Sequence, residues 1–161
     1  MNVYETLKTI VERDFDVEVW EPARSRLDTT YGRYRLYVPA IEVYPIAFEA
    51  DFMVSVLAHE LIHARRFGVS NAPLAPFEIG FEETIAVIGG NLVGRYFGDT
   101  EPGFKWLAGR EAEAEYAYPR YEEAVELGHQ FALDIIERIE HETHVRRTRR
   151  DRDEHRRRGA A

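Results

Sequence analysis

The sequence contains no cysteine, which excludes both a disulfide framework and a zinc ribbon built from thiolates. Any metal held by side chains must therefore be bound through imidazole nitrogens or carboxylate oxygens. A long uninterrupted hydrophobic run is also missing, since residues 1–14 carry acidic side chains within their apolar pattern. A start of this kind is typical of neither a signal peptide nor a membrane span, so we expect a cytoplasmic protein with no membrane partner.

The length and composition are those of an ordinary globular chain. Of the 161 residues, 45% are hydrophobic and 31% are charged, which argues against wholesale disorder. No internal repeat divides the sequence. We predict a single domain over residues 1–145, followed by a basic and disordered tail over residues 146–161.

The net charge of −8 is unevenly distributed along the chain. Residues 146–161 contain eight arginines against three acids, a local balance of +5, so the first 145 residues carry −13. An acidic body of this kind disfavours nucleic acid as a partner. The arginine-rich tail is the exception, because it could contact phosphates, an acidic partner or the body itself.

Hydrophobic spacing and capping residues predict an α-helical framework. Asn2 is a candidate N-cap for the first helix, Gly68 ends the second, and Pro119 suits the first turn of the last, which is expected to end near His141. The segment 68–80, which contains two glycines and two prolines, is interpreted as a loop. The predicted helices cover residues 2–13, 50–67, 81–96, 104–115 and 119–141.

Strand signals are confined to the first third of the sequence. Apolar alternation predicts short strands over residues 15–19, 34–38 and 41–44, with Pro39 and Pro45 as punctuation. Few strands combined with several helices indicate an α+β fold. We expect a small antiparallel or mixed sheet of about three strands, packed against the helices.

A cluster of chemically active side chains lies within the apolar helix predicted over residues 50–67. The sequence His59-Glu60-Leu61-Ile62-His63 places two imidazoles four residues apart, on the same face of a helix. Two ring nitrogens at this spacing can share one metal ion, and Glu60 can reach a water molecule in an open coordination position. Burying these polar groups without a metal or other partners would be costly.

A third protein ligand is expected from the next helix, which must return past the first. Glu82 and Glu83 both lie near its start. Either acid could be the ligand. The acid that does not bind the metal is interpreted as a solvated carboxylate or as one that orients a ligand imidazole. The adjacent Arg65 and Arg66 are interpreted as solvated residues favoured by the helix dipole.

In these residues the chain resembles the gluzincin metallopeptidases, which include thermolysin and the minigluzincins. The shared features are the His-Glu-Leu-Ile-His motif, an acid on the following helix, and a small residue three positions beyond that acid. Glu83 followed by Ala86 meets the last two features, whereas Glu82 would place Ile85 at the small position. Nineteen residues separate His63 from Glu83, as in thermolysin-like enzymes. The resemblance covers about residues 50–97.

The resemblance implies a zincin-like fold in which His59, His63 and Glu83 bind Zn²⁺. Glu60 would then activate the zinc-bound water for attack on the scissile carbonyl of a peptide or protein substrate. Zincins lay the substrate along an edge strand, which would here be residues 34–38 or 41–44. A downstream tyrosine or histidine stabilises the oxyanion in this family, and we select Tyr121. The full set of candidates for that role is Tyr116, Tyr118, Tyr121 and His129.

One position departs from the thermolysin-like pattern. Four residues after the glutamate ligand those enzymes carry an aspartate that orients a histidine, and Val87 stands there in this chain. A different residue must therefore orient that imidazole, or the imidazole is held less firmly.

Two alternative functions are compatible with the same residues. ImmA- and IrrE-like regulatory proteases, which act on a repressor, share the zinc site, although their usual motif carries glycine where this chain has Ile62. The other alternative is a zincin fold retained as a non-catalytic binding module. The presence of Glu60 disfavours this second alternative, because pseudoenzymes commonly lose the base or a ligand.

Overall fold

The computed structural model describes residues 2–23, 31–35, 37–67, 76–99 and 120–159, and every structural statement below concerns these residues. They form an α+β structure with five helices and a three-stranded mixed sheet, and the fold class and the small sheet agree with the prediction. No helix in the described ranges is long and apolar enough to cross a membrane. The predicted helix over residues 104–115 lies outside them.

Helix α1 (Val3–Phe15) opens the fold, and it begins as predicted. The side chain of Asn2 caps the helix by accepting a hydrogen bond from the backbone N–H of Tyr4 at 3.1 Å. The helix ends at Asp16, which adopts a left-handed conformation with φ of 54°. The prediction of a strand beginning at Phe15 was wrong, because the apolar face of the helix extends through that residue.

The sheet contains β1 (Glu18–Trp20), β2 (Gly32–Arg35) and β3 (Ala40–Val43) in the order β1-β3-β2. Strand β3 is central, pairing in parallel with β1 and antiparallel with β2. Strand β2 therefore lies at an edge of the sheet. This position is important because β2 also contacts the helix that carries the histidine motif.

The segment between β2 and β3 differs from the prediction. Residues 37–39 form a turn rather than the end of a strand, and the side chain of Tyr37 is 87% exposed. The alternation in residues 34–38 looks like a strand in the sequence. However, β2 and β3 pair antiparallel over a short connection, so the chain has to reverse direction there.

Two helices occupy the region in which one was predicted over residues 50–67. The short helix α2 (Pro45–Glu49) starts with proline at its first turn, and helix α3 (Met53–Phe67) follows it. Between them Asp51 adopts a left-handed conformation with φ of 55°, which prevents one continuous helix. The motif His59-Glu60-Leu61-Ile62-His63 lies in the middle of α3.

The N-terminal end of α3 is capped by a residue distant in sequence. The carboxylate of Asp99 accepts hydrogen bonds from the backbone N–H and the hydroxyl of Ser55, at 2.7 and 2.9 Å. An acidic group at this end of a helix also complements the helix dipole. Burial raises the pKa of Asp99 despite these hydrogen bonds. Asp99 thereby connects the end of the following helix to the start of α3.

Helix α4 (Pro76–Phe97) begins earlier than expected. Residues 76–80 were predicted as part of a loop, and this was wrong. Pro76 is the first helical residue, a position that needs no backbone N–H donor and tolerates a fixed φ. Residues 68–75 of the predicted loop lie outside the described part of the chain.

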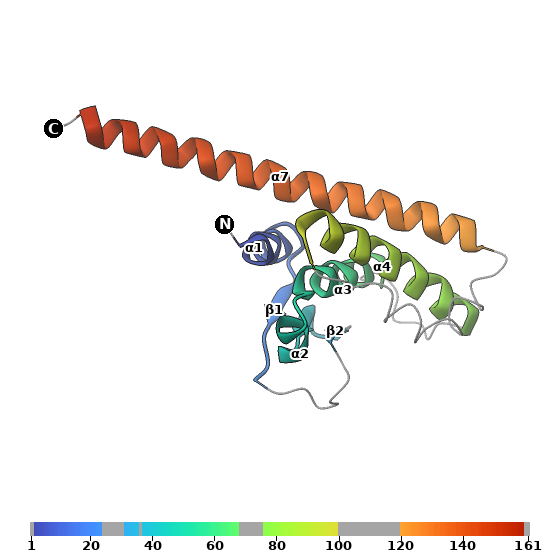
Figure 1. The fold of residues 1–161 in the computed structure, drawn as a ribbon. Coiled ribbons are helices and arrows are strands. Elements are labelled where there is room, and N and C mark those ends of the chain that lie inside the picture. The colour runs from blue at the N-terminus through green and yellow to red at the C-terminus, as the bar shows by residue number, and fades with distance from the viewer. Residues whose placement is uncertain (1, 24–30, 36, 68–75, 100–119, 160–161) are drawn as a thin grey trace.

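Helix α7 (Tyr121–Gly159) is much longer than predicted. At about 1.5 Å per residue it measures roughly 58 Å, and Figure 1 shows it extending past the rest of the molecule. The expected end near His141 was wrong, and residues 146–159 are helical rather than disordered. Arginine and glutamate favour helix formation, and Arg146 pairs with Glu142 one turn earlier at 2.9 Å. The division into a domain and a tail stays a prediction.

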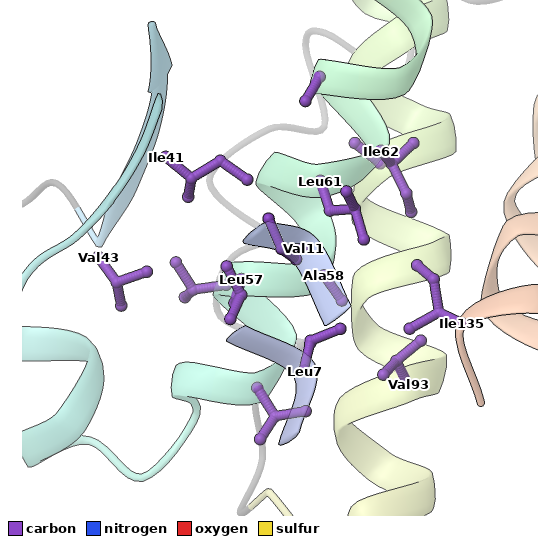
Figure 2. Close-up of a cluster of buried hydrophobic side chains, with 14 of the residues drawn as sticks. Leu7, Val11, Ile41, Val43, Leu57, Ala58, Leu61, Ile62, Val93 and Ile135 are labelled. Carbon is purple, nitrogen blue, oxygen red and sulfur yellow. The ribbon is translucent and has the colours of Figure 1, made fainter. Parts of the chain in front are cut away.

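The core lies on both sides of α3. Figure 2 shows Leu57 and Leu61 of this helix between Ile41 of the sheet and the helices beyond. Helix α4 packs against α3 on one side and against α7 on the other (Figure 1). The motif helix is thus covered from several directions, which explains why eleven consecutive residues from Val54 to Ala64 are buried.

An ionic cluster forms on the sheet. Glu42 of β3 is only 4% exposed, and its carboxylate pairs with Arg35 of β2 at 2.6 Å and accepts a hydrogen bond from the Tyr44 hydroxyl at 2.6 Å. Burial raises the pKa of Glu42, but these two partners outweigh burial and the pKa lies below its ordinary value. Burial, together with Glu42, raises the pKa of Tyr44 to about 12.

We predict that Glu42→Gln lowers the free energy of unfolding by about 1–3 kcal/mol at neutral pH. Because its pKa is depressed in the fold, ionised Glu42 stabilises the protein above its ordinary pKa of 4.5. That stabilisation is lost as pH falls through the lower folded-state pKa. Urea unfolding of both proteins between pH 3 and 7 should show the difference shrinking towards acid. A difference independent of pH would contradict the assignment.

Candidate metal centre

Helix α3 buries both histidines of the motif and the glutamate between them. His59, Glu60 and His63 are 2%, 5% and 6% exposed, respectively. Four-residue spacing brings the two imidazoles together, so their Nε2 atoms lie 3.0 Å apart and their ring planes are nearly perpendicular, at 82°. The ring of His63 also stacks on Phe67, with centroids 5.3 Å apart.

Helix α4 supplies the third group. The carboxylate oxygens of Glu83 lie 3.7 Å from Nε2 of His59 and 3.4 Å from Nε2 of His63. The three residues each offer one ligand atom, and these three atoms all lie within 4.8 Å of one another. Two donors bound tetrahedrally at about 2.1 Å from an ion are roughly 3.4 Å apart. The observed separations fit a shared metal ion, whose identity they leave open.

Close packing of α3 against α4 makes this meeting possible. A Cβ atom added at Gly90 would lie 2.7 Å from the backbone oxygen of Ser55 and 2.9 Å from Cβ of His59. One turn later, a Cβ atom at Gly94 would lie 1.7 Å from the hydroxyl of Ser55. Glycine at these two positions lets the helix backbones approach, and Glu83 lies on the same face of α4, two turns before Gly90.

Glu82, the alternative ligand candidate, has a different partner. Its carboxylate forms a two-point ion pair with Arg66 of α3, in which Nε bonds one oxygen and Nη2 bonds the other at 2.7 Å. The Glu82 side chain is only 14% exposed. The interpretations of Glu82 as solvated or as an imidazole-orienting group were therefore wrong. The Arg66–Glu82 pair instead links the two helices that carry the candidate ligands.

Arg65 was also predicted to be solvated, and the structure gives it a partner as well. It bonds Asp134 of α7 at 2.6 Å and lies over the ring of Phe131. The two adjacent arginines thus point to different helices, because successive helical residues are about 100° apart.

Glu60 lies beneath the edge strand. A Cβ atom added at Gly32 of β2 would be 3.2 Å from Oε1 of Glu60 and 2.4 Å from a methyl group of Val56. Only a residue without a side chain lets the strand backbone pass this close to the motif helix. A glycine next to a strand is usually interpreted as a turn signal, so no local pattern connects Gly32 with Glu60.

Among the described residues, no hydrogen bond or ion pair links Tyr121, the predicted oxyanion-stabilising residue, to the metal-ligand cluster. Tyr121 starts α7 with a side chain that is 46% exposed, and it makes no hydrogen bond within the described part of the chain. Its catalytic role stays a prediction. His129 is exposed on α7, and Tyr116 and Tyr118 lie outside the described residues. Val87, in the place of the family's aspartate, is buried at 2% exposure.

Comparisons with known proteins assign no family to the chain. No family model, no curated protein and no solved structure matches the chain. The case for a metal centre therefore depends on the His59, His63 and Glu83 cluster itself.

We predict that the purified chain binds one equivalent of zinc and that His63→Ala and Glu83→Gln each lose it. Each change removes one donor from a three-donor set, which leaves too few ligands for tight binding. Elemental analysis after dialysis measures the stoichiometry. The exposed His141 provides a matched control, since His141→Ala also removes a histidine but should leave binding intact. Full zinc content in both ligand variants would refute the site.

We predict that Arg66→Ala weakens zinc binding by about 10- to 100-fold without unfolding the protein, because the ion pair fixes α4 relative to α3. Glu82→Gln should have a similar effect, and the double variant should be little worse than either single variant. Competition with a zinc-sensitive chelator dye measures the affinity. Arg65→Ala is the control, because its partner is on α7. Equal affinities in Arg66→Ala and the wild type would show that the pair has no positioning role.

Proposed function

We propose that this protein is a zinc-dependent hydrolase of peptide bonds with a zincin-like fold. The observation that carries the proposal is the convergence of His59, His63 and Glu83, with the buried carboxylate of Glu60 adjacent to the first histidine. Two histidines on adjacent turns that face one glutamate match the donor set of catalytic zinc sites. An ion pair with only a structural role would not require this combination of residues.

The chemistry divides between the metal and the chain. A bound zinc ion would polarise a carbonyl group and make a water molecule more acidic. Glu60, as general base, would accept a proton from the attacking water and deliver it to the leaving amine. Its burial beneath Gly32 supports this role, because the strand and the helix hold the carboxylate in a confined position.

The edge strand β2 supports an extended substrate. Its only sheet neighbour among the described residues is β3, and it passes directly over Glu60 at Gly32. An extended peptide can pair with the backbone of such an edge, which brings its own carbonyl groups close to the strand. Residues 34–38 or 41–44 were expected to form the strand that pairs with the substrate. Because residues 41–44 correspond to the central β3, we assign substrate pairing to β2.

The alternatives differ in substrate or in turnover. A regulatory protease acting on a repressor would use the same residues, and only its substrate would distinguish it. A non-catalytic binding module would hold the metal without needing Glu60 as a base. Turnover is therefore the property that separates an enzyme from a module.

We predict that Glu60→Gln reduces cleavage of an unstructured protein, such as casein, by at least about 100-fold while zinc content stays at one equivalent. The amide is nearly isosteric but cannot accept the proton, and general base catalysis contributes roughly 10²–10⁴ in rate. Cleavage followed by mass spectrometry of the products measures the effect.

The controls separate the metal from the base. Glu78→Gln, a neutralised acid on α4 outside the cluster, should cleave at the wild-type rate. Zinc content equal to that of the wild type together with undiminished cleavage by Glu60→Gln would refute the assigned role. A zinc-loaded wild type that leaves casein intact would favour the binding module or a regulatory protease with a dedicated substrate.

A further inference from the structure

The C-terminal part of α7, residues 143–159, forms a basic arm that extends away from the rest of the molecule (Figure 1). The last buried side chain of this helix among the described residues is Ile139. The ion pair between Glu142 and Arg13 of α1, at 2.7 Å, lies at the point where the arm leaves the body. The arm is therefore outside the core that stabilises the other helices.

The composition of the arm excludes hydrophobic docking. Val145 is the one apolar side chain among residues 143–157, so no apolar stripe exists for a coiled-coil partner or for the interior of a bilayer. The arm is helical without a hydrophobic face. Its interactions with any partner must be dominated by charge.

Most of the described arginines are gathered on one side of the arm. At 100° per residue, five of the six described arginines fall within an arc of about 160°, with Asp153 as the acid among them, and Arg147 lies outside this arc. Asp151 and His155 lie on the opposite side. The members of this basic face are Arg146, Arg149, Arg150, Arg152 and Arg157.

The position of the arm separates this face from the acidic body, except at Arg146, which pairs with Glu142. Arg150 is about 12 Å along the helix axis from Glu142, which exceeds the roughly 8 Å over which physiological salt screens charge. Repulsion between the −13 of residues 1–145 and an approaching polyanion is thus weakened at the arm. The expectation that the body disfavours nucleic acid does not extend to this segment.

We propose that the basic arm binds double-stranded nucleic acid through the phosphate backbone, without sequence preference. A helix about 10–12 Å across matches the major groove of B-DNA, which is about 12 Å wide. The face from Arg146 to Arg157 spans about 17 Å, a length over which a duplex presents roughly ten phosphates. The acidic body of a second copy is a weaker match, because its 26 acids are interspersed with 13 lysines and arginines.

The test is fluorescence anisotropy of a labelled 24-base-pair duplex titrated with the whole 161-residue chain. We expect binding at 50 mM salt that weakens steeply as salt rises, with a slope of about −4 in log affinity against log salt concentration. Replacing Arg149, Arg150, Arg152 and Arg157 by glutamine should weaken binding at least tenfold and flatten the slope. Glutamine keeps the helix propensity, which circular dichroism can verify.

A charge-preserving control uses lysine at the same four positions. It should bind the duplex with nearly the wild-type salt slope, since phosphate neutralisation requires charge rather than a particular side chain. Two results would overturn the proposal. One is absence of duplex binding by the wild type at 50 mM salt. The other is equal binding by the glutamine variant. Self-association that is lost in the glutamine variant, without duplex binding, would assign the arm to a second copy instead.

Discussion

The close contact between α3 and α4 is the constraint on which the candidate site depends. His59 and His63 come from one helix and Glu83 from the other, so the three donors meet only when the helix backbones nearly touch. Gly90 provides that contact at the level of His59, where any side chain would collide with the backbone of α3. At these positions α4 has lower helix propensity than it would have with alanine, because glycine costs roughly 1 kcal/mol in a helix interior.

Charged groups at both ends of α3 stabilise the same arrangement. Asp99 accepts hydrogen bonds from the first turn of the helix, and Arg66 in the last turn pairs with Glu82 of α4. Each charge has the sign that the helix dipole favours at its end. The two contacts lie at opposite ends of the α3–α4 interface, so together they oppose sliding and rotation of one helix on the other.

The long helix α7 combines two different physical environments. Its first half packs on α4 through small and apolar residues such as Ala124 and Ile135, and Gly128 lies against Ile88. Its second half has no buried side chain among the described residues and depends on local helix propensity and ion pairs. Such a helix can be long without a large core, because arginine and glutamate lose little side-chain freedom in helical conformation.

Local patterns in the sequence were enough to predict the motif helix, the helix that carries Glu83, and an α+β fold with about three strands. Four-residue spacing determines the pairing of His59 with His63 whatever surrounds them, because the period of the helix fixes it. The extension of α7 beyond His141 depends on local helix propensity, but the charge density of that segment was interpreted as a sign of disorder. The partner of Glu82 and the close approach of Gly32 to Glu60 were not predictable. Each depends on which surfaces meet across long sequence separations, and the tertiary packing alone decides that.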